Sequence, residues 1–205
     1  MKVIFYITAI VICSICSCTG QRITESTVIS PTSTYVKGNN FEGAVFSDSY
    51  GVDFFKFDIK QHFRQYQEGA STRFTPTFAQ IEFAERILQK SLRHDNRHTF
   101  HQSRGYGPIV HRHLPKYQRQ YFGYTTASNE QIIYINAGWE RYTLIDRLQN
   151  LYPRDETWKN DYRIVMDGGS YYWSIEVNLT TGKLSAFGTN GLASLWSNSR
   201  EDYDV

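Results

Sequence analysis

The distribution of cysteine constrains this chain more than any other feature of its sequence. The three cysteines, Cys13, Cys16 and Cys18, all lie in the N-terminal segment that ends at residue 18. Residues 19–205 therefore contain no disulfide, no thiol nucleophile and no cysteine ligand for a metal. An exported domain built from these residues has to be stabilised by its packed core alone.

The segment around the cysteines has the features of an export signal. Lys2 precedes an apolar run over residues 3–12, which is about ten residues long and much shorter than the roughly 20 needed to span a bilayer. The sequence Ile15-Cys16-Ser17-Cys18 resembles the lipobox of bacterial lipoproteins, although Cys16 departs from the small residue usual at its position. The resemblance implies that residues 1–17 are removed and that the thiol of Cys18 receives lipid, with acyl chains such as palmitate.

An ordinary secretory signal peptide explains the same residues differently. Cys18-Thr19-Gly20 is a tolerable small-x-small cleavage site, and cleavage after Gly20 would give a secreted or periplasmic protein that begins at Gln21. In the lipoprotein interpretation the chain is anchored in a membrane of the cell envelope. Thr19 lacks the acidic side chain that favours the inner membrane, so by analogy the outer membrane is preferred.

The remaining sequence divides into three parts. Residues 18–40 are rich in Ser and Thr without helical periodicity, which predicts a flexible tether. Residues 41–196 have the length of a single domain, and residues 197–205 form a polar C-terminal tail. A chain of this size buries enough surface to be stable without disulfides.

Charge and aromatic content limit the classes of partner that this domain can bind. The formal net charge is +2, with basic and acidic residues interspersed, so no nucleic acid partner is expected. The 15 Tyr, 13 Phe and 4 Trp predict aromatic packing in a β-sheet core. The alternative is an exposed aromatic platform for sugars or peptides, with Tyr172 on the wet face of a strand.

One amphipathic helix is predicted, with Thr75 as its N-cap and Pro76 in its first turn. Its apolar residues recur at intervals of three and four, and Glu82 can pair with Arg86 on the other side. They are Phe78, Ile81, Ala84, Ile87, Leu88 and Leu92.

Alternating patterns predict strands on both sides of this helix. One precedes it at residues 53–59, and the others follow in hairpins at residues 118–126, 131–138, 162–166, 170–179 and 183–189, with a short helix at residues 142–151. In the strand over residues 170–179, Trp173, Ile175 and Val177 are expected to face the core.

This element order predicts the α+β class: an antiparallel sheet of four to six strands with one long helix packed on one face. The order resembles the cystatin-like and NTF2-like folds, and residues 163–191 resemble the C-terminal part of small exported lipoproteins of Bacteroidota. Neither resemblance implies an activity.

No catalytic motif stands out in the sequence. Ser170 follows two glycines but lacks the G-x-S-x-G elbow, and a hairpin turn explains those glycines. Four carboxylates are interpreted as solvated surface groups because the sequence places no two of them at a catalytic separation. They are Glu140, Asp146, Asp167 and Glu176.

Residues 94–116 predict a long irregular loop that contains five of the six histidines. These are His94, His98, His101, His111 and His113. Together with Asp95, such a set could ligate zinc or copper. The interleaved Arg93, Arg97, Arg104 and Arg112 oppose a cation, however, and suit an anionic partner such as a lipid headgroup, a lipopolysaccharide phosphate or an acidic protein face. A merely solvated loop is the third interpretation.

The leading functional hypothesis is a membrane-tethered, non-enzymatic module that binds a protein, peptide or glycan at the cell envelope. One alternative is a metal-binding protein or metal-dependent hydrolase that uses the loop from His94 to His113. Another is an envelope immunity or inhibitor protein.

Overall fold

The computed structural model describes residues 20–50, 72–96, 107–139, 155–165 and 168–190. The predicted leader over residues 1–17, the lipid-accepting Cys18, the strand over residues 53–59, the helix over residues 142–151 and the tail over residues 197–205 lie outside the described residues. Those predictions stay predictions.

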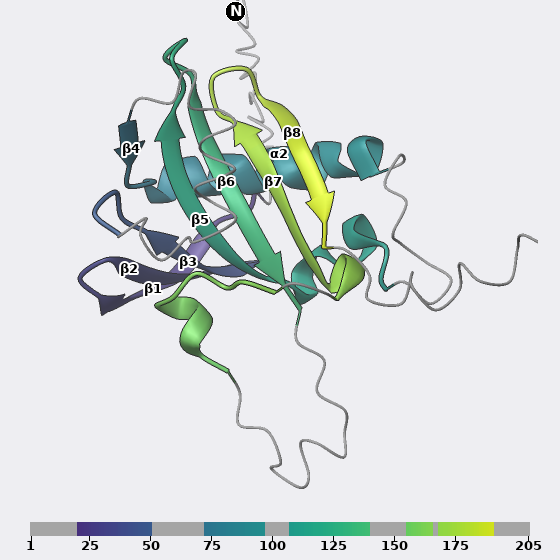
Figure 1. Ribbon diagram of the computed structural model, residues 1–205, viewed down its shortest axis with the longest axis horizontal. Helices are drawn as coiled ribbons and strands as arrows, with labels where there is room; N and C mark the ends of the chain where they lie inside the picture. The colour runs from purple at the N-terminus through teal and green to yellow at the C-terminus, as the bar shows by residue number, and fades with distance from the viewer. Residues whose placement is uncertain (1–19, 51–71, 97–106, 140–154, 166–167, 191–205) are drawn as a thin grey trace, which may run out of the picture.

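The fold is one large sheet with a helix across one face (Figure 1). The strands are β1 (Ile23–Ser30), β2 (Ser33–Gly38), β3 (Glu42–Phe46), β4 (Thr72–Phe74), β5 (Gln118–Thr125), β6 (Gln131–Gly138), β7 (Tyr172–Asn178) and β8 (Lys183–Thr189). The helix is α2 (Phe78–Asp95). The α+β class is confirmed, but the sheet has 8 strands and is larger than the four to six that the sequence predicts.

The strands follow the order β1-β2-β3-β5-β6-β7-β8, and β4 pairs with β5 beyond the end of β3. Every pair is antiparallel except β3 and β5, which run parallel. The chain between these two strands contains β4 and α2, so the helix is part of the long crossover that a parallel pair requires. Figure 1 shows a strongly twisted sheet, with β1 to β3 lying nearly crosswise to β5 to β8.

The prediction of a flexible tether over residues 18–40 is wrong for residues 23–38. This segment forms the hairpin of β1 and β2, in which Ile23 lies opposite Gly38 and Ser30 opposite Ser33. Thr, Val and Ile have high strand propensity, and a Ser- and Thr-rich pattern is also what an exposed edge strand requires. Local composition does not distinguish a tether from an edge strand, and the pairing of β2 with β3 makes this segment part of the sheet. The domain therefore begins before residue 41.

Helix α2 starts two residues later than predicted. Thr77 is the N-cap: its Oγ1 accepts a hydrogen bond from the backbone N–H of Gln80 at 3.3 Å, and Gln80 Oε1 accepts one from the backbone N–H of Thr77 at 2.8 Å. This reciprocal pair is a capping box. Thr75 is engaged elsewhere, because its hydroxyl donates to Asp48 Oδ1 at 3.0 Å.

The predicted apolar face of α2 is largely confirmed, since Ile81, Ala84, Leu88 and Leu92 are fully buried. Phe78 is the exception, because it lies in the first turn and is 42% exposed.

Two of the predicted hairpins are confirmed, namely β5 with β6 and β7 with β8. The predicted strand over residues 162–166 is wrong for residues 162–165, which pair with no strand. The backbone of Arg163 bonds to side chains instead: its N–H donates to Gln120 Oε1 and its C=O accepts from Asn136 Nδ2, both at 2.9 Å. Gly168 and Gly169, with positive φ angles of 119° and 55°, lead into the 3-10 turn η6 (Gly169–Tyr171) and not into a hairpin.

The loop predicted over residues 94–116 is shorter than expected. Helix α2 extends to Asp95, and the end of the segment forms two 3-10 turns, η3 (Val110–Arg112) and η4 (Leu114–Lys116). Val110 and Leu114 are buried in the core beneath α2, which explains why these turns are ordered.

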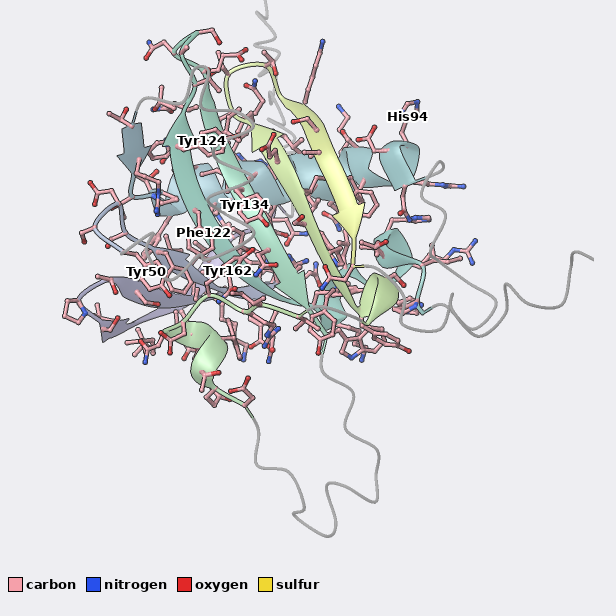
Figure 2. The ribbon with its side chains drawn as sticks, viewed as in Figure 1. Tyr50, His94, Phe122, Tyr124, Tyr134 and Tyr162 are labelled. Carbon is pink, nitrogen blue, oxygen red and sulfur yellow. The ribbon has the colours of Figure 1, made fainter. Side chains whose placement is uncertain are left out.

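The sheet carries a hydrophobic core on each face. On the helix side, the predicted inward residues Trp173, Ile175 and Val177 are buried and pack with α2. On the other side lies an aromatic cluster, which includes Phe46, Tyr50, Phe122, Tyr124, Tyr134 and Trp158 (Figure 2). Phe46 and Phe122 stack with ring centroids 4.7 Å apart. These aromatic residues are buried, as β-sheet packing requires.

The second core overturns the interpretation of Glu176 as a solvated surface group. Glu176 is only 2% exposed, because both faces of β7 are covered. Its carboxylate accepts hydrogen bonds from the hydroxyl of Tyr124 at 2.8 Å and from the hydroxyl of Ser185 at 3.2 Å.

Candidate functional site

A buried ion pair joins the middle of α2 to β5. Arg119 Nε lies 2.9 Å from Glu85 Oε1, and the two side chains are 1% and 4% exposed. The hydroxyl of Tyr121 donates to the same carboxylate oxygen at 2.8 Å. Arg119 and Tyr121 are two residues apart on β5, so their side chains point to the same face of the sheet, where α2 lies.

Backbone carbonyl groups hold the other end of the guanidinium. Arg119 donates from Nη1 to the carbonyl of Tyr117 at 2.8 Å and from Nη2 to the carbonyl of Leu114 at 3.0 Å. These acceptors lie in and after η4, so the turn fixes the position of the charge. Arg119 Nε has the ion-pair contact with Glu85 but no hydrogen bond within the described residues, so the two carbonyl groups are what fix the guanidinium beside Glu85.

Burial controls the protonation of this cluster. Desolvation raises the pKa of Glu85, and the charge of Arg119 and the hydrogen bond from Tyr121 partly offset this rise. Desolvation and the neighbouring Glu85 raise the pKa of Tyr121 as well. Tyr121 therefore stays a hydroxyl donor.

A small polar cavity of about 100 Å³ adjoins the ion pair. It has room for about three water molecules. Six of its lining residues are Gln21, Glu85, Gln89, His111, Leu114 and Arg119. The cavity thus brings together the N-terminal segment, α2, the turns η3 and η4, and β5.

Gln21 closes one side of the cavity. It is 4% exposed, and its Nε2 donates to Gln89 Oε1 at 2.7 Å. Its Oε1 is buried and has no hydrogen-bond partner within the described part of the chain. A buried polar atom without a hydrogen bond is destabilising, and two lining residues of this cavity have one: Gln21 at Oε1 and Arg119 at Nε.

His111 lies on another side of the cavity. Asn96 Nδ2 lies 2.7 Å from His111 Nδ1, and when the amide donates, the proton of the neutral ring is on Nε2. Burial lowers the pKa of His111, and the positive charges of Arg112 and Arg93 lower it further. The ring is therefore a neutral group in a positive field.

The cavity presents polar groups, but its lining residues do not form a nucleophilic site. Its groups are hydrogen-bond acceptors on Gln21 and Glu85, an imidazole donor on His111 and a fixed positive charge on Arg119. None of its lining side chains is a serine, threonine or cysteine that a neighbouring base could activate.

The predicted metal ligands do not gather in the part of the chain that the structure describes. His94 is exposed at the end of α2, where its Nδ1 lies 3.3 Å from Asp95 Oδ1 (Figure 2). The ring of His113 packs against Trp139 with centroids 5.6 Å apart. No group of three or more His, Cys, Asp or Glu residues occurs within residues 20–50, 72–96, 107–139, 155–165 and 168–190. His98 and His101 lie outside these residues, so the metal hypothesis stays untested.

Two of the predicted anion-binding arginines lie close enough to His111 to affect its pKa. Arg93 on α2 and Arg112 on η3 are both exposed, and both act electrostatically on His111. Arg97 and Arg104 lie outside the described residues.

The predicted aromatic surface residue, Tyr172, is half-buried on β7. It borders a polar cavity of about 390 Å³ together with Asp155 and Arg163.

Ser170 is completely buried, and its hydroxyl donates to the carbonyl of Pro108 at 2.6 Å. It is a structural side chain, and its buried hydroxyl is not accessible as a nucleophile. The carboxylates Glu140, Asp146 and Asp167 lie outside the described residues.

Of the residues that define the cavity, the sequence points only to His111. Gln21 falls within the predicted tether, and Glu85 and Arg119 belong to no sequence motif. A signal for Glu85 existed, because it falls on the apolar stripe of α2 beside Ala84, between Ile81 and Leu88. A charged residue on a core-facing stripe predicts a buried partner.

No protein family, no curated protein and no solved structure matches this chain. In the described part of the chain, α2 and the short turns include no segment that is both long and apolar enough to cross a membrane as a helix.

Proposed function

We propose that this chain is a lipid-anchored, non-enzymatic binding module of the cell envelope, held close to the membrane by Cys18. The observation that carries the proposal is the burial of Gln21, only three residues after Cys18. Three residues span at most about 11 Å when fully extended. A lipid on Cys18 would therefore hold the domain at the membrane surface, without the flexible spacer that the sequence suggested.

Contacts around Gln21 support a fixed orientation of the domain. The backbone N–H of Ile23 donates to Glu82 Oε1 at 2.8 Å, and Asn39 Nδ2 donates to the carbonyl of Gly20 at 3.4 Å. The chain is thus bonded to the domain from Gly20 onward. The side of the molecule that carries the Gln21 cavity would face the membrane.

The free edge of the sheet supports a protein or peptide as the partner. Within the described residues β1 pairs only with β2, so its outer backbone edge is open to another strand. Val28 on this strand is 73% exposed and Ile29 is 36% exposed. An extended peptide that adds to β1 would gain backbone hydrogen bonds and apolar contact.

Mass spectrometry of the mature N-terminus tests the anchor. Protein purified from the envelope is expected to begin at Cys18 and to carry a diacylglyceryl group. The variant Cys18→Ser should lose the lipid and leave the membrane fraction. A mature chain that begins at an unmodified Gln21 would overturn the proposal.

Site-specific photo-crosslinking tests the partner surface. A photoreactive residue in place of Val28 should crosslink one envelope protein or peptide, whereas the same residue in place of the exposed Thr180, at the far hairpin, should not. The purified partner should bind the Val28→Pro variant at least tenfold more weakly. Equal crosslinking from both positions, or unchanged binding to the variant, contradicts a partner on β1.

A further inference from the structure

We propose that the Gln21 cavity binds a hydroxylated phosphate ester, the chemistry of a glycerol phosphate headgroup, with its hydroxyls inside and its phosphate at the rim. The proposed function supplies the source of this ligand, because an anchor on Cys18 would place the cavity beside the lipid headgroups. The chemistry of the site follows from its own residues.

The interior of the cavity offers acceptors to a hydrogen-bond donor. Gln21 Oε1 is buried and has no partner among the described residues, while the amide nitrogen of the same side chain already donates to Gln89. Arg119 Nε is likewise without a hydrogen bond there, so a group that both donates and accepts suits the cavity. Glu85 also lines the cavity, and Tyr121 and Arg119 both approach its Oε1. Its other oxygen, Oε2, is the one left for a ligand. A donor that enters the cavity can therefore bond to an amide oxygen and a carboxylate oxygen.

A hydroxyl fits this interior better than an ammonium group. The charge of Glu85 is already balanced by Arg119, and Arg93 and Arg112 add positive charge around His111. This positive surrounding repels a cation. A hydroxyl donates to the two oxygens and can also accept from Nε2–H of His111, which is the proton-bearing nitrogen when Asn96 donates to Nδ1.

The side of the cavity formed by His111 is its rim, and this rim suits an anion. Arg112 follows His111 on η3, and Arg93 on α2 precedes Asn96, which bonds to His111. Both arginine side chains are exposed, and although they do not line the cavity, both act on His111. Guanidinium groups bind phosphate oxygens in a bidentate manner, and two of them near one site favour a phosphate over a neutral ligand. The cavity volume of about 100 Å³ is in the size class of a three-carbon polyol, with the phosphate left outside.

Direct titration of the full-length mature protein in a neutral detergent tests this proposal. The probes are dihexanoyl phosphatidylglycerol, dihexanoyl phosphatidic acid, dihexanoyl phosphatidylcholine and soluble glycerol 3-phosphate, each followed by calorimetry. Phosphatidylglycerol should bind at least tenfold more tightly than phosphatidic acid, which has the phosphate but lacks the hydroxyls. Phosphatidylcholine should not bind.

Other outcomes of the titration have definite meanings. Equal binding of phosphatidylglycerol and phosphatidic acid overturns the cavity and leaves only a basic surface. Glycerol 3-phosphate that binds as tightly as the short-chain lipid supports the cavity and overturns the membrane as its source. The glycerol 3-phosphate arm does not require an anchor, so a failure of lipidation at Cys18 and a failure of the cavity are distinguishable.

Variants distinguish the contribution of the cavity interior to lipid binding from that of the arginines at the rim. Gln21→Met should abolish the preference for phosphatidylglycerol over phosphatidic acid, and His111→Ala should weaken that preference in a second, independent variant. The double variant Arg93→Gln, Arg112→Gln should weaken both lipids at least tenfold. Gln131→Met, which changes an exposed glutamine on β6, is the matched control and should change nothing. A retained preference in a folded Gln21→Met protein overturns the proposal.

Discussion

The two faces of the sheet each bury a glutamate beside a tyrosine of β5. On the helix face, Glu85 accepts from the hydroxyl of Tyr121, and on the other face Glu176 accepts from the hydroxyl of Tyr124, both at 2.8 Å. Tyr121 and Tyr124 are three positions apart on one strand, an odd separation that places them on opposite faces. The same local motif therefore occurs twice.

The surroundings of the two glutamates differ. Both oxygens of Glu176 are bonded, to Tyr124 and to Ser185, beside a packed aromatic cluster. Glu85 is paired with Arg119 and borders a cavity that also contains the unpartnered Oε1 of Gln21. Both faces therefore bury a glutamate, so burial alone does not mark a site. The candidate site differs because a cavity and an unsatisfied polar atom lie beside its glutamate.

Loss of the arginine should give the largest effect. Arg119→Met leaves the buried charge of Glu85 without its partner, and we expect a loss of about 3–5 kcal/mol in the free energy of unfolding. On the other face, Glu176→Gln keeps an acceptor for Tyr124 and should cost about 1 kcal/mol. Urea denaturation of both variants measures the difference. Equal losses would show that the two faces bury charge in the same way.

The same comparison predicts a pH dependence. Because burial raises the pKa of Glu85 in the folded state, its ionisation destabilises the fold as pH rises from about 4.5 through that raised pKa. Arg119→Met removes the charge that offsets this rise, so the stability deficit of the variant should be largest at pH 8 and should shrink at pH 5. A deficit that is independent of pH would exclude Glu85 as its cause.

The two tyrosines allow a matched test of intermediate size. Tyr121→Phe and Tyr124→Phe each remove one hydroxyl that donates to a carboxylate, with an expected loss of about 1.5–3 kcal/mol in each case. The Tyr121→Phe deficit should fall as pH is lowered, since burial raises the pKa of Glu85 and its protonated form no longer needs the donor. Chemical denaturation at two pH values compares them, and the reverse pattern would contradict the assignment of the two faces.

Substitutions of Gln21 and Ser185 should change the free energy of unfolding by smaller amounts and in opposite directions. Gln21→Met replaces an unsatisfied amide with an apolar side chain of similar length, so stability should stay within about 1 kcal/mol of the unmodified protein or increase. Ser185→Ala removes a satisfied hydrogen bond and should lower stability by up to about 1 kcal/mol. Thermal unfolding of the two variants measures both changes in stability. A large loss in Gln21→Met would indicate a packing role for Gln21 and not a binding role.

The smallest effect concerns His111. Burial and the two arginines lower its pKa below the usual 6.5, so folding loses stability as pH falls from about 6.5 towards the lowered value. Arg93→Gln should move the pKa of His111 back towards 6.5, as measured by NMR titration of the ring. Arg86→Gln, which removes an exposed arginine that lies over the ring of Phe83, is the control and should leave the pKa unchanged. Identical titration curves in the two variants would remove Arg93 from the rim of the cavity.

Elements whose stabilising pattern lies within their own residues could be predicted from the sequence. The apolar stripe of α2 and the alternation in β7 each contain the information for one face of one element. The N-cap could not be placed in the same way, because Thr75 and Thr77 are both good caps and the contact of Thr75 with Asp48 decides between them. Residues 162–165 likewise have strand propensity, but side chains of β5 and β6 bond their backbone.

The candidate site was even less accessible to sequence reasoning. Gln21, Glu85, His111 and Arg119 come from four elements that are separated along the chain, so no spacing pattern connects them. The histidines form a cluster in the sequence, but proximity along the chain does not bring them together: His111 bonds to Asn96, and His94 is exposed at the end of α2.

The sequence by itself determined the absence of cysteine after Cys18, the long amphipathic helix, the strand-rich α+β class and the expectation of a lipid anchor. These depend on composition and on periodicity, which are local properties. Only the tertiary structure decided that residues 23–38 are strands, that Glu85 and Glu176 are buried, and that Gln21, three residues after Cys18 in the sequence, closes a cavity. Pairing and burial depend on which distant segments meet, and it is this long-range packing that converts an apparent tether into one wall of the candidate site.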